Sequence, residues 1–95
     1  MLTLSQISNA AKIVANEYPI TKMHLFGSYA EGRNTPDSDV DLLVEFDIDS
    51  VSLLTLASLK YRLEELLEVE VDVIHAPLEE SALIAPERLV EIYAA

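Results

Sequence analysis

Apolar residues recur along the N-terminal segment at steps of three and four, which is the spacing of one face of an amphipathic helix. This pattern predicts a helix from Thr3 to about Tyr18. Thr3 or Ser5 would cap its start, and Pro19 ends it, because the residue before a proline is pushed out of helical geometry. The residues expected on its buried side are Ile7, Ala10, Ala11, Val14 and Tyr18.

Two short apolar segments follow, and both are predicted to be strands. The first covers about residues 22–26 and the second residues 40–46. The second is apolar at nearly every position apart from its acids, which indicates burial on both faces of a sheet. Between the strands, residues 27–32 are expected to form one short helical turn and residues 33–37 a polar loop.

A second long helix is predicted next. Asp49 or Ser50 would cap it, and it would continue to about Leu67. Its charged residues lie mostly opposite an apolar stripe, which identifies the buried side. The stripe consists of Leu53, Leu56, Leu59 or Lys60, Leu63, Leu66 and Leu67.

The remaining residues predict one strand and one helix. Residues 70–74 (EVDVI) alternate, so that Asp72 faces away from its two valine neighbours. Residues 77–85 are expected to be irregular. Pro86 suits the first turn of a final helix. The buried side of that helix would consist of Leu89, Val90, Ile92 and Tyr93.

The predicted order is therefore α-β-(short α)-β-α-β-α. This order is typical of a small α/β (α+β) domain, in which a mixed sheet of three to four strands packs with helices. The chain has 95 residues, of which 51% are hydrophobic, so residues 1–95 are expected to form a single domain with a real core. It contains no cysteine, which excludes disulfides and thiolate chemistry.

The net charge of the chain limits the classes of molecule that it is expected to bind. Seventeen acidic residues against six basic ones give a net charge of −11. Such a surface repels phosphate backbones, so direct nucleic-acid binding is not expected, whereas a basic protein or divalent cations would be attracted. The alternative is that the acidity only aids solubility.

No segment has the pattern of a membrane span or a signal peptide, so we expect a soluble cytoplasmic protein without a membrane partner.

Asp39 and Asp41 are the first candidates for chemistry. They flank Val40 at the start of the second strand, and side chains two positions apart on a strand share a face. Two neighbouring carboxylates repel each other unless a cation neutralises them. Carboxylate oxygens suit Mg²⁺, which completes its coordination with waters and phosphates.

Gly27 and Ser28 follow the first strand directly. Glycine allows backbone to approach a ligand closely, and a helix that opens at Ser28 would direct its N–H groups at an anion. A Gly-Ser pair after a strand is also an ordinary turn, so this pair alone does not establish a phosphate site.

Asp72 is the third candidate, because a bare carboxylate is costly to bury among valines and isoleucine. If its strand lies beside that of Asp39 and Asp41, the three carboxylates form one cluster, which can hold two metal ions. Alternatively, Asp72 lies at a strand end and is solvated.

In combination, a strand, Gly27-Ser28, a spacer, Asp39-Val40-Asp41 and a later strand carboxylate resemble the minimal nucleotidyltransferases of the DNA polymerase β superfamily. Their signature is Gly-Ser, a spacer and Asp-x-Asp. The resemblance covers GSYAEGRNTPDSDVDLLVEF and extends to the VDVIHAP segment.

The resemblance implies roles for the matching residues. Gly27 and Ser28 would hold the triphosphate of ATP, Asp39 and Asp41 would bind two Mg²⁺ ions together with Asp72, and Asp72 would help deprotonate the acceptor hydroxyl. The chain departs from the family at Glu31, where relatives commonly carry a basic residue. Arg33 is the candidate substitute for contact with the triphosphate.

Short members of this family resemble the antitoxins that pair with HEPN-domain ribonuclease toxins. That resemblance implies transfer of AMP from ATP to a toxin tyrosine, because a domain this small needs another protein to supply the acceptor. Two alternatives stay open. One is a binding module that neutralises its partner by occlusion. The other is a small-molecule nucleotidyltransferase completed by a partner chain, so that a homo-oligomer or a hetero-oligomer is compatible with the sequence.

Overall fold

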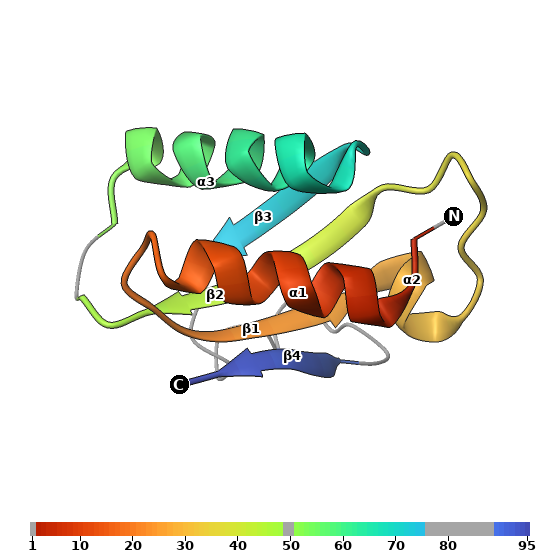
Figure 1. Ribbon diagram of the computed structural model, residues 1–95, viewed down its shortest axis with the longest axis horizontal. Coiled ribbons are helices and arrows are strands. Elements are labelled where there is room, and N and C mark those ends of the chain that lie inside the picture. The colour runs from red at the N-terminus through yellow and green to blue at the C-terminus, as the bar shows by residue number, and fades with distance from the viewer. Residues whose placement is uncertain (1, 49–50, 76–88) are drawn as a thin grey trace.

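A four-stranded mixed sheet carries the site residues, with helices packed beside it (Figure 1). The computed structural model describes residues 2–48, 51–75 and 89–95. The elements in chain order are α1 (Leu4–Ala15), β1 (Ile20–Phe26), α2 (Gly27–Glu31), β2 (Val40–Phe46), α3 (Leu53–Leu67), β3 (Val71–His75) and β4 (Val90–Ala94). The strand order is β3-β2-β1-β4. β2 and β3 are parallel, and β1 is antiparallel to both β2 and β4.

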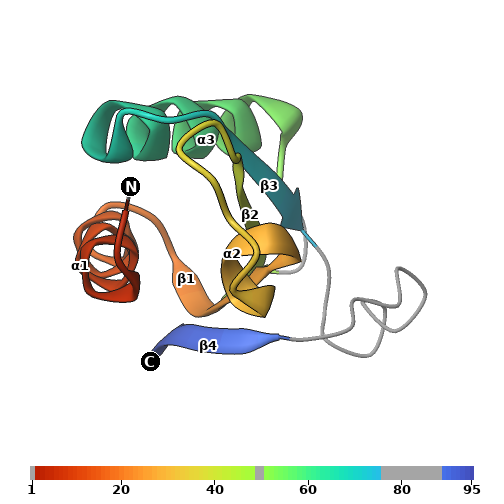
Figure 2. The same cartoon turned by 90° about the vertical axis from the view of Figure 1, so that its right-hand side faces the viewer.

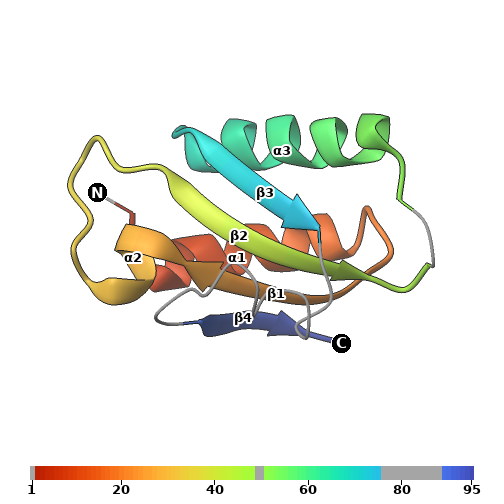
Figure 3. The ribbon, with the colours of Figure 1, turned by 180° about the vertical axis from the view of Figure 1, so that it is seen from behind.

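The two long helices cover the same face of the sheet. Figure 2 shows α1 and α3 side by side on one side of the strands, and in Figure 3 the strands lie in front of both helices. The core lies between these helices and the sheet. Its largest fully buried members include Ile7, Val14, Met23, Leu25, Leu42, Val44, Leu59 and Leu63. None of the described helices combines the length and the apolar character that crossing a lipid bilayer requires.

The start of α1 matches the sequence prediction, and its end does not. The Thr3 hydroxyl accepts the N–H of Gln6 at 3.1 Å, and the Gln6 side chain accepts the N–H of Thr3 at 2.8 Å, a reciprocal capping box. The helix ends at Ala15, with Asn16 as its C-cap, three residues before the predicted end at Tyr18.

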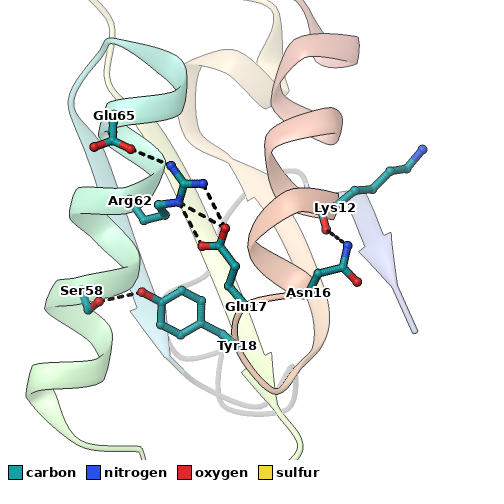
Figure 4. Close-up of polar contacts among 7 residues, drawn as sticks. All are labelled: Lys12, Asn16, Glu17, Tyr18, Ser58, Arg62 and Glu65. Carbon is teal, nitrogen blue, oxygen red and sulfur yellow. Dashed lines mark hydrogen bonds and ion pairs between the residues drawn. The ribbon is translucent and has the colours of Figure 1, made fainter.

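The residues after α1 join it to α3 through polar contacts (Figure 4). Arg62 donates hydrogen bonds to Glu17, with its Nε 2.9 Å from Oε1, and to Glu65, with Nη1 2.6 Å from Oε1. The hydroxyls of Tyr18 and Ser58 lie 2.6 Å apart. The Arg62 guanidinium lowers the pKa of the Glu17 carboxyl. These contacts hold the two helices together at the end of the sheet where β1 begins.

The strands β1, β2 and β3 lie close to their predicted bounds. β2 spans the predicted residues, and its Val40, Leu42, Leu43 and Val44 are all buried, as expected for a strand covered on both faces. β1 begins at Ile20, two residues early, and β3 is displaced by one residue toward the C-terminus. The predicted helix caps at Asp49 or Ser50 are wrong, because the Ser52 hydroxyl caps α3 by accepting the N–H of Thr55 at 3.1 Å.

The predicted C-terminal helix is wrong. Residues 90–94 form β4, which pairs with β1 along the edge that β2 leaves open. Ile92 is buried while Glu91 is exposed, so the same apolar residues that fit a helical spacing also fit an alternating one. Backbone hydrogen bonds to β1 favour the strand at this short segment. Pro86 and the irregular segment predicted at residues 77–85 lie outside the described residues.

Candidate active site

Strand pairing places Asp41 directly beside Asp72. β2 and β3 are parallel, and their register aligns Asp41 with Asp72. On the other side, Asp41 is aligned with Phe26, the last residue of β1. Val40 and Leu42, which flank Asp41, belong to the core under the helices, so Asp41 and Asp72 project from the opposite face of the sheet.

Asp39 joins this pair from the residue before β2. Burial, the Asp72 carboxylate and, least, the Asp39 charge raise the pKa of Asp41 from 3.8 to about 6. Asp72 acts on Asp41 both through its charge and through a hydrogen bond between the two side chains. The structure therefore pairs Asp41 with the more exposed Asp72, and the Asp39 charge acts on Asp41 more weakly.

The donor set can be compared with the needs of Mg²⁺. Across residues 2–48, 51–75 and 89–95, no three or more His, Asp or Glu side chains form a ready metal cluster. Mg²⁺ does not need one, because it binds through one or two carboxylates and takes the rest of its coordination from water and phosphate. Burial first, and then the neighbouring acidic side chains, raise the pKa of Asp41, and a bound divalent cation would favour its ionised form. The residues therefore fit Mg²⁺ held together with a phosphate ligand.

Gly27 lies against the Asp41 carboxylate. Its φ of +73° belongs to the left-handed region, and a Cβ at this position would overlap Oδ2 of Asp41. Glycine is thus required here twice, for backbone conformation and for space. The close approach places the Gly27-Ser28 bend beside Asp41.

The residues after Ser28 turn back on α2. The carbonyl of Ser28 accepts the N–H of Arg33 at 2.9 Å. The Arg33 guanidinium donates to Glu31, with Nε 3.0 Å from Oε1 and Nη2 also in contact with that oxygen. Arg33 thus carries its positive charge beside Glu31, the last residue of α2. Its contact with a triphosphate stays a prediction.

Two residues of α3 that sequence reasoning did not assign to the site hold β3 in place. The Val71 N–H donates to Glu64 Oε2 at 3.0 Å, and Lys60 Nζ donates to the Val71 carbonyl at 2.9 Å and to Glu64 at 2.6 Å. The Glu64 carboxylate and the Lys60 ammonium group therefore hold the backbone of Val71, the residue next to Asp72. The i, i+4 spacing of Lys60 and Glu64 was a visible signal of an ion pair, but the sequence could not show that the pair binds a strand.

Three aromatic side chains of the types that often occur in binding sites have structural positions here. Tyr29 is buried in the core and does not present its ring for stacking. His24 is buried in β1. The His75 ring packs edge-on against Phe46, with 5.2 Å between ring centroids.

Comparison with known proteins agrees with this geometry. A family profile described as a nucleotidyltransferase domain matches residues 7–93. The protein adenylyltransferase MntA of Thermococcus cleftensis is 37% identical over 78 residues, which cover 78% of this chain and 79% of that protein.

Solved structures share the fold. A toxin–antitoxin crystal structure with AMP-PNP superposes with a TM-score of 0.76 at 19% identity, covering 93% of this chain and 73% of that one. A tri-AMPylated Shewanella oneidensis HEPN toxin in complex with its MNT antitoxin gives a TM-score of 0.65 at 21% identity, covering 95% and 73%. At these identities the structural similarity establishes the fold.

The lack of space for a side chain at Gly27 can be tested by comparing two variants, Gly27→Ala and Gly32→Ala. Gly27 and Gly32 have nearly the same φ, +73° and +72°, but only at Gly27 would a Cβ meet another side chain. Gly32→Ala should cost about 1–2 kcal/mol through conformation alone. Gly27→Ala should cost at least about 1 kcal/mol more, because it also displaces Asp41. Urea denaturation measures both, and equal losses would contradict the proposed contact.

The carboxylate cluster predicts an unusual pH dependence. The folded pKa of Asp41 lies above its ordinary value, so Asp41 favours folding at low pH and loses this contribution as the pH rises through about 6. Asp41→Asn should therefore unfold less easily than the wild type above about pH 7, by about 1–2 kcal/mol after allowance for solvent screening, and the gain should vanish below about pH 4. Denaturation without divalent cations measures this, with the exposed Asp47→Asn as control. A gain that is independent of pH would refute the assignment.

The role of Glu64 can be separated from that of an ordinary surface acid. Glu64→Ala removes the acceptor of the Val71 N–H, whereas Glu65→Ala removes only a contact with Arg62 on the exposed side of α3. Glu64→Ala should lower the urea midpoint more and speed amide exchange at Val71 at least about tenfold. Equal behaviour of the two variants would show that Glu64 does not hold β3.

Proposed function

Because the chain belongs to the nucleotidyltransferase domain family, we propose that residues 1–95 act as one enzyme domain that transfers AMP from ATP to a partner protein. The observation that carries this proposal is the alignment of Asp41 with Asp72 across β2 and β3, with Gly27 directly against Asp41. A relative with 37% identity is named as a protein adenylyltransferase, which supports a protein acceptor.

The reaction requires one substitution at phosphorus. The acceptor hydroxyl oxygen attacks the α-phosphorus of ATP, the bond from that phosphorus to the bridging oxygen breaks, and pyrophosphate leaves. The hydroxyl proton passes to Asp72, which is the most exposed of the three carboxylates and therefore the one that an incoming protein can reach. Such a reaction depends on positioning and charge neutralisation more than on covalent chemistry by the enzyme.

Asp39, Asp41 and Asp72 would hold Mg²⁺, two ions in the arrangement that the family resemblance implies. When bound, the metal neutralises the phosphate oxygens and the departing pyrophosphate. The chain's own contribution is to hold the three carboxylates at one end of β2 and β3, where their mutual repulsion favours cation binding.

Gly27 and Ser28 would face the triphosphate, since the backbone at Gly27 leaves room for a ligand beside Asp41. Arg33 would add positive charge near this bend. Its guanidinium is paired with Glu31, so contact with the phosphates would require exchange of that carboxylate for phosphate oxygens.

We further propose that the acceptor is a tyrosine of a HEPN-type toxin and that the chain acts as its antitoxin. A structural neighbour is the MNT antitoxin in complex with a tri-AMPylated HEPN toxin, and another was crystallised in a toxin–antitoxin pair with AMP-PNP. The net charge of −11 suits a basic, RNA-binding partner.

The test is the double variant Asp39→Asn and Asp41→Asn. Incubated with ATP, Mg²⁺ and a purified HEPN-domain toxin, the wild type should add AMP to a tyrosine of that protein, detected by mass analysis of both chains. The double variant should transfer at least about a hundredfold more slowly, because it removes charges that hold the metal.

Asp47→Asn is the matched control, since Asp47 is exposed at the end of β2 remote from Asp72 and should transfer at the wild-type rate. If the double variant neutralises the toxin as well as the wild type does, neutralisation occurs by occlusion and the enzymatic mechanism is wrong.

A further inference from the structure

The outer side of α3 exposes large apolar side chains. Leu53 is 84% exposed, Leu54 81% and Tyr61 65%, whereas Leu59 and Leu63 on the opposite side are fully buried. Leu53, Ala57 and Tyr61 are spaced by four residues and therefore lie in one row, with Leu54 beside them. We call these four residues the α3 row. Exposed apolar side chains gathered in one row on a helix are typical of a protein-binding surface.

The α3 row runs toward the strand that carries Asp72. Lys60 Nζ lies 5.9 Å from the ring centroid of Tyr61 and donates to the carbonyl of Val71, so one end of the row reaches the start of β3. β3 is the outermost strand on its side of the described sheet, and Figure 1 shows α3 running alongside it. A protein that contacts the α3 row can therefore reach around the edge of β3 to the carboxylates on the other face.

Charge selects among the possible occupants of this surface. Glu65 and Glu68 lie exposed on the same side of α3 beyond Tyr61, and both cations of the helix already contact acids, Lys60 with Glu64 and Arg62 with Glu65 and Glu17. A second copy of this chain, with its net charge of −11, would bring like charges together. A protein whose apolar patch is flanked by Lys or Arg would match both parts of the surface.

We propose that the α3 row is the docking surface for the acceptor protein, which binds with apolar side chains on Leu53, Leu54 and Tyr61 and with basic residues toward Glu65. This inference rests on the proposed function, because it takes the occupant to be the protein that receives AMP. Docking here leaves the nucleotide site accessible, since the carboxylates project from the sheet face that α3 does not cover.

The experiment compares Leu54→Glu and Tyr61→Glu with Leu4→Glu. Leu4 is 52% exposed on α1, so its variant introduces the same charge on a helix that is not part of the row. All three positions are exposed, and thermal unfolding should confirm that each variant is folded. The probe is a purified HEPN-domain toxin, with affinity measured by calorimetry and AMP transfer by mass analysis.

We expect Leu54→Glu and Tyr61→Glu each to weaken binding of the HEPN protein at least about tenfold and to raise its KM, with affinity for ATP unchanged. Leu4→Glu should behave as the wild type. Wild-type binding should also weaken as salt is added, because charge contributes to the contact.

Other outcomes separate this inference from the proposed function. If the wild type transfers AMP and the two α3 variants bind and transfer equally well, the docking surface is wrong and the enzymatic function stands. If the wild type binds without transfer and the α3 variants lose binding, the surface is correct and the enzymatic function is wrong. A wild type that does not bind the HEPN protein, or a homodimer in sedimentation that Leu54→Glu abolishes, overturns the docking inference.

Discussion

The site depends on the register of two parallel strands. Asp41 and Asp72 meet because β2 and β3 pair with these residues side by side. A slip of one residue would turn Asp72 to the helix-covered face and separate the two carboxylates. The register is held at its start, where the Val40 N–H donates to the Glu70 carbonyl at 3.0 Å and Glu64 accepts the Val71 N–H. These hydrogen bonds therefore hold the backbone of β3 at the residues next to Asp72.

This arrangement places negative charges where they oppose folding. The raised pKa of Asp41 shows that burial and its acidic neighbours make the ionised form unfavourable without a cation. Gly27 adds a second constraint, since a side chain at this position would overlap the Asp41 carboxylate. Strained, charged groups of this kind persist where binding of a ligand compensates for them, so the local instability and the proposed nucleotide site have the same physical origin.

The two faces of the sheet carry different groups. One face is covered by α1 and α3, whose inner sides form the core. The carboxylates occupy the other face, near the Gly27-Ser28 bend. Since α3 keeps apolar side chains on its outer side, partner binding and nucleotide chemistry can occupy different surfaces joined at the edge of β3.

The sequence by itself determined the parts of the site that are close along the chain. Asp39 and Asp41 share a face because a strand has a period of two, the capping box of α1 follows from Thr3 and Gln6, and β2 was predicted within its observed bounds. These features depend on local geometry, which a sequence displays directly.

Only the tertiary structure decided the rest. Asp72 is exposed near the start of β3, and its place beside Asp41 came from pairing between strands about thirty residues apart in the chain. Residues 90–94 have spacing that suits a helix, yet the open edge of β1 made them a strand. Lys60 and Glu64 form an ion pair within α3, but their bonds to Val71 required β3 to lie alongside α3. In each case the deciding partner is distant in sequence, so no local pattern could reveal it.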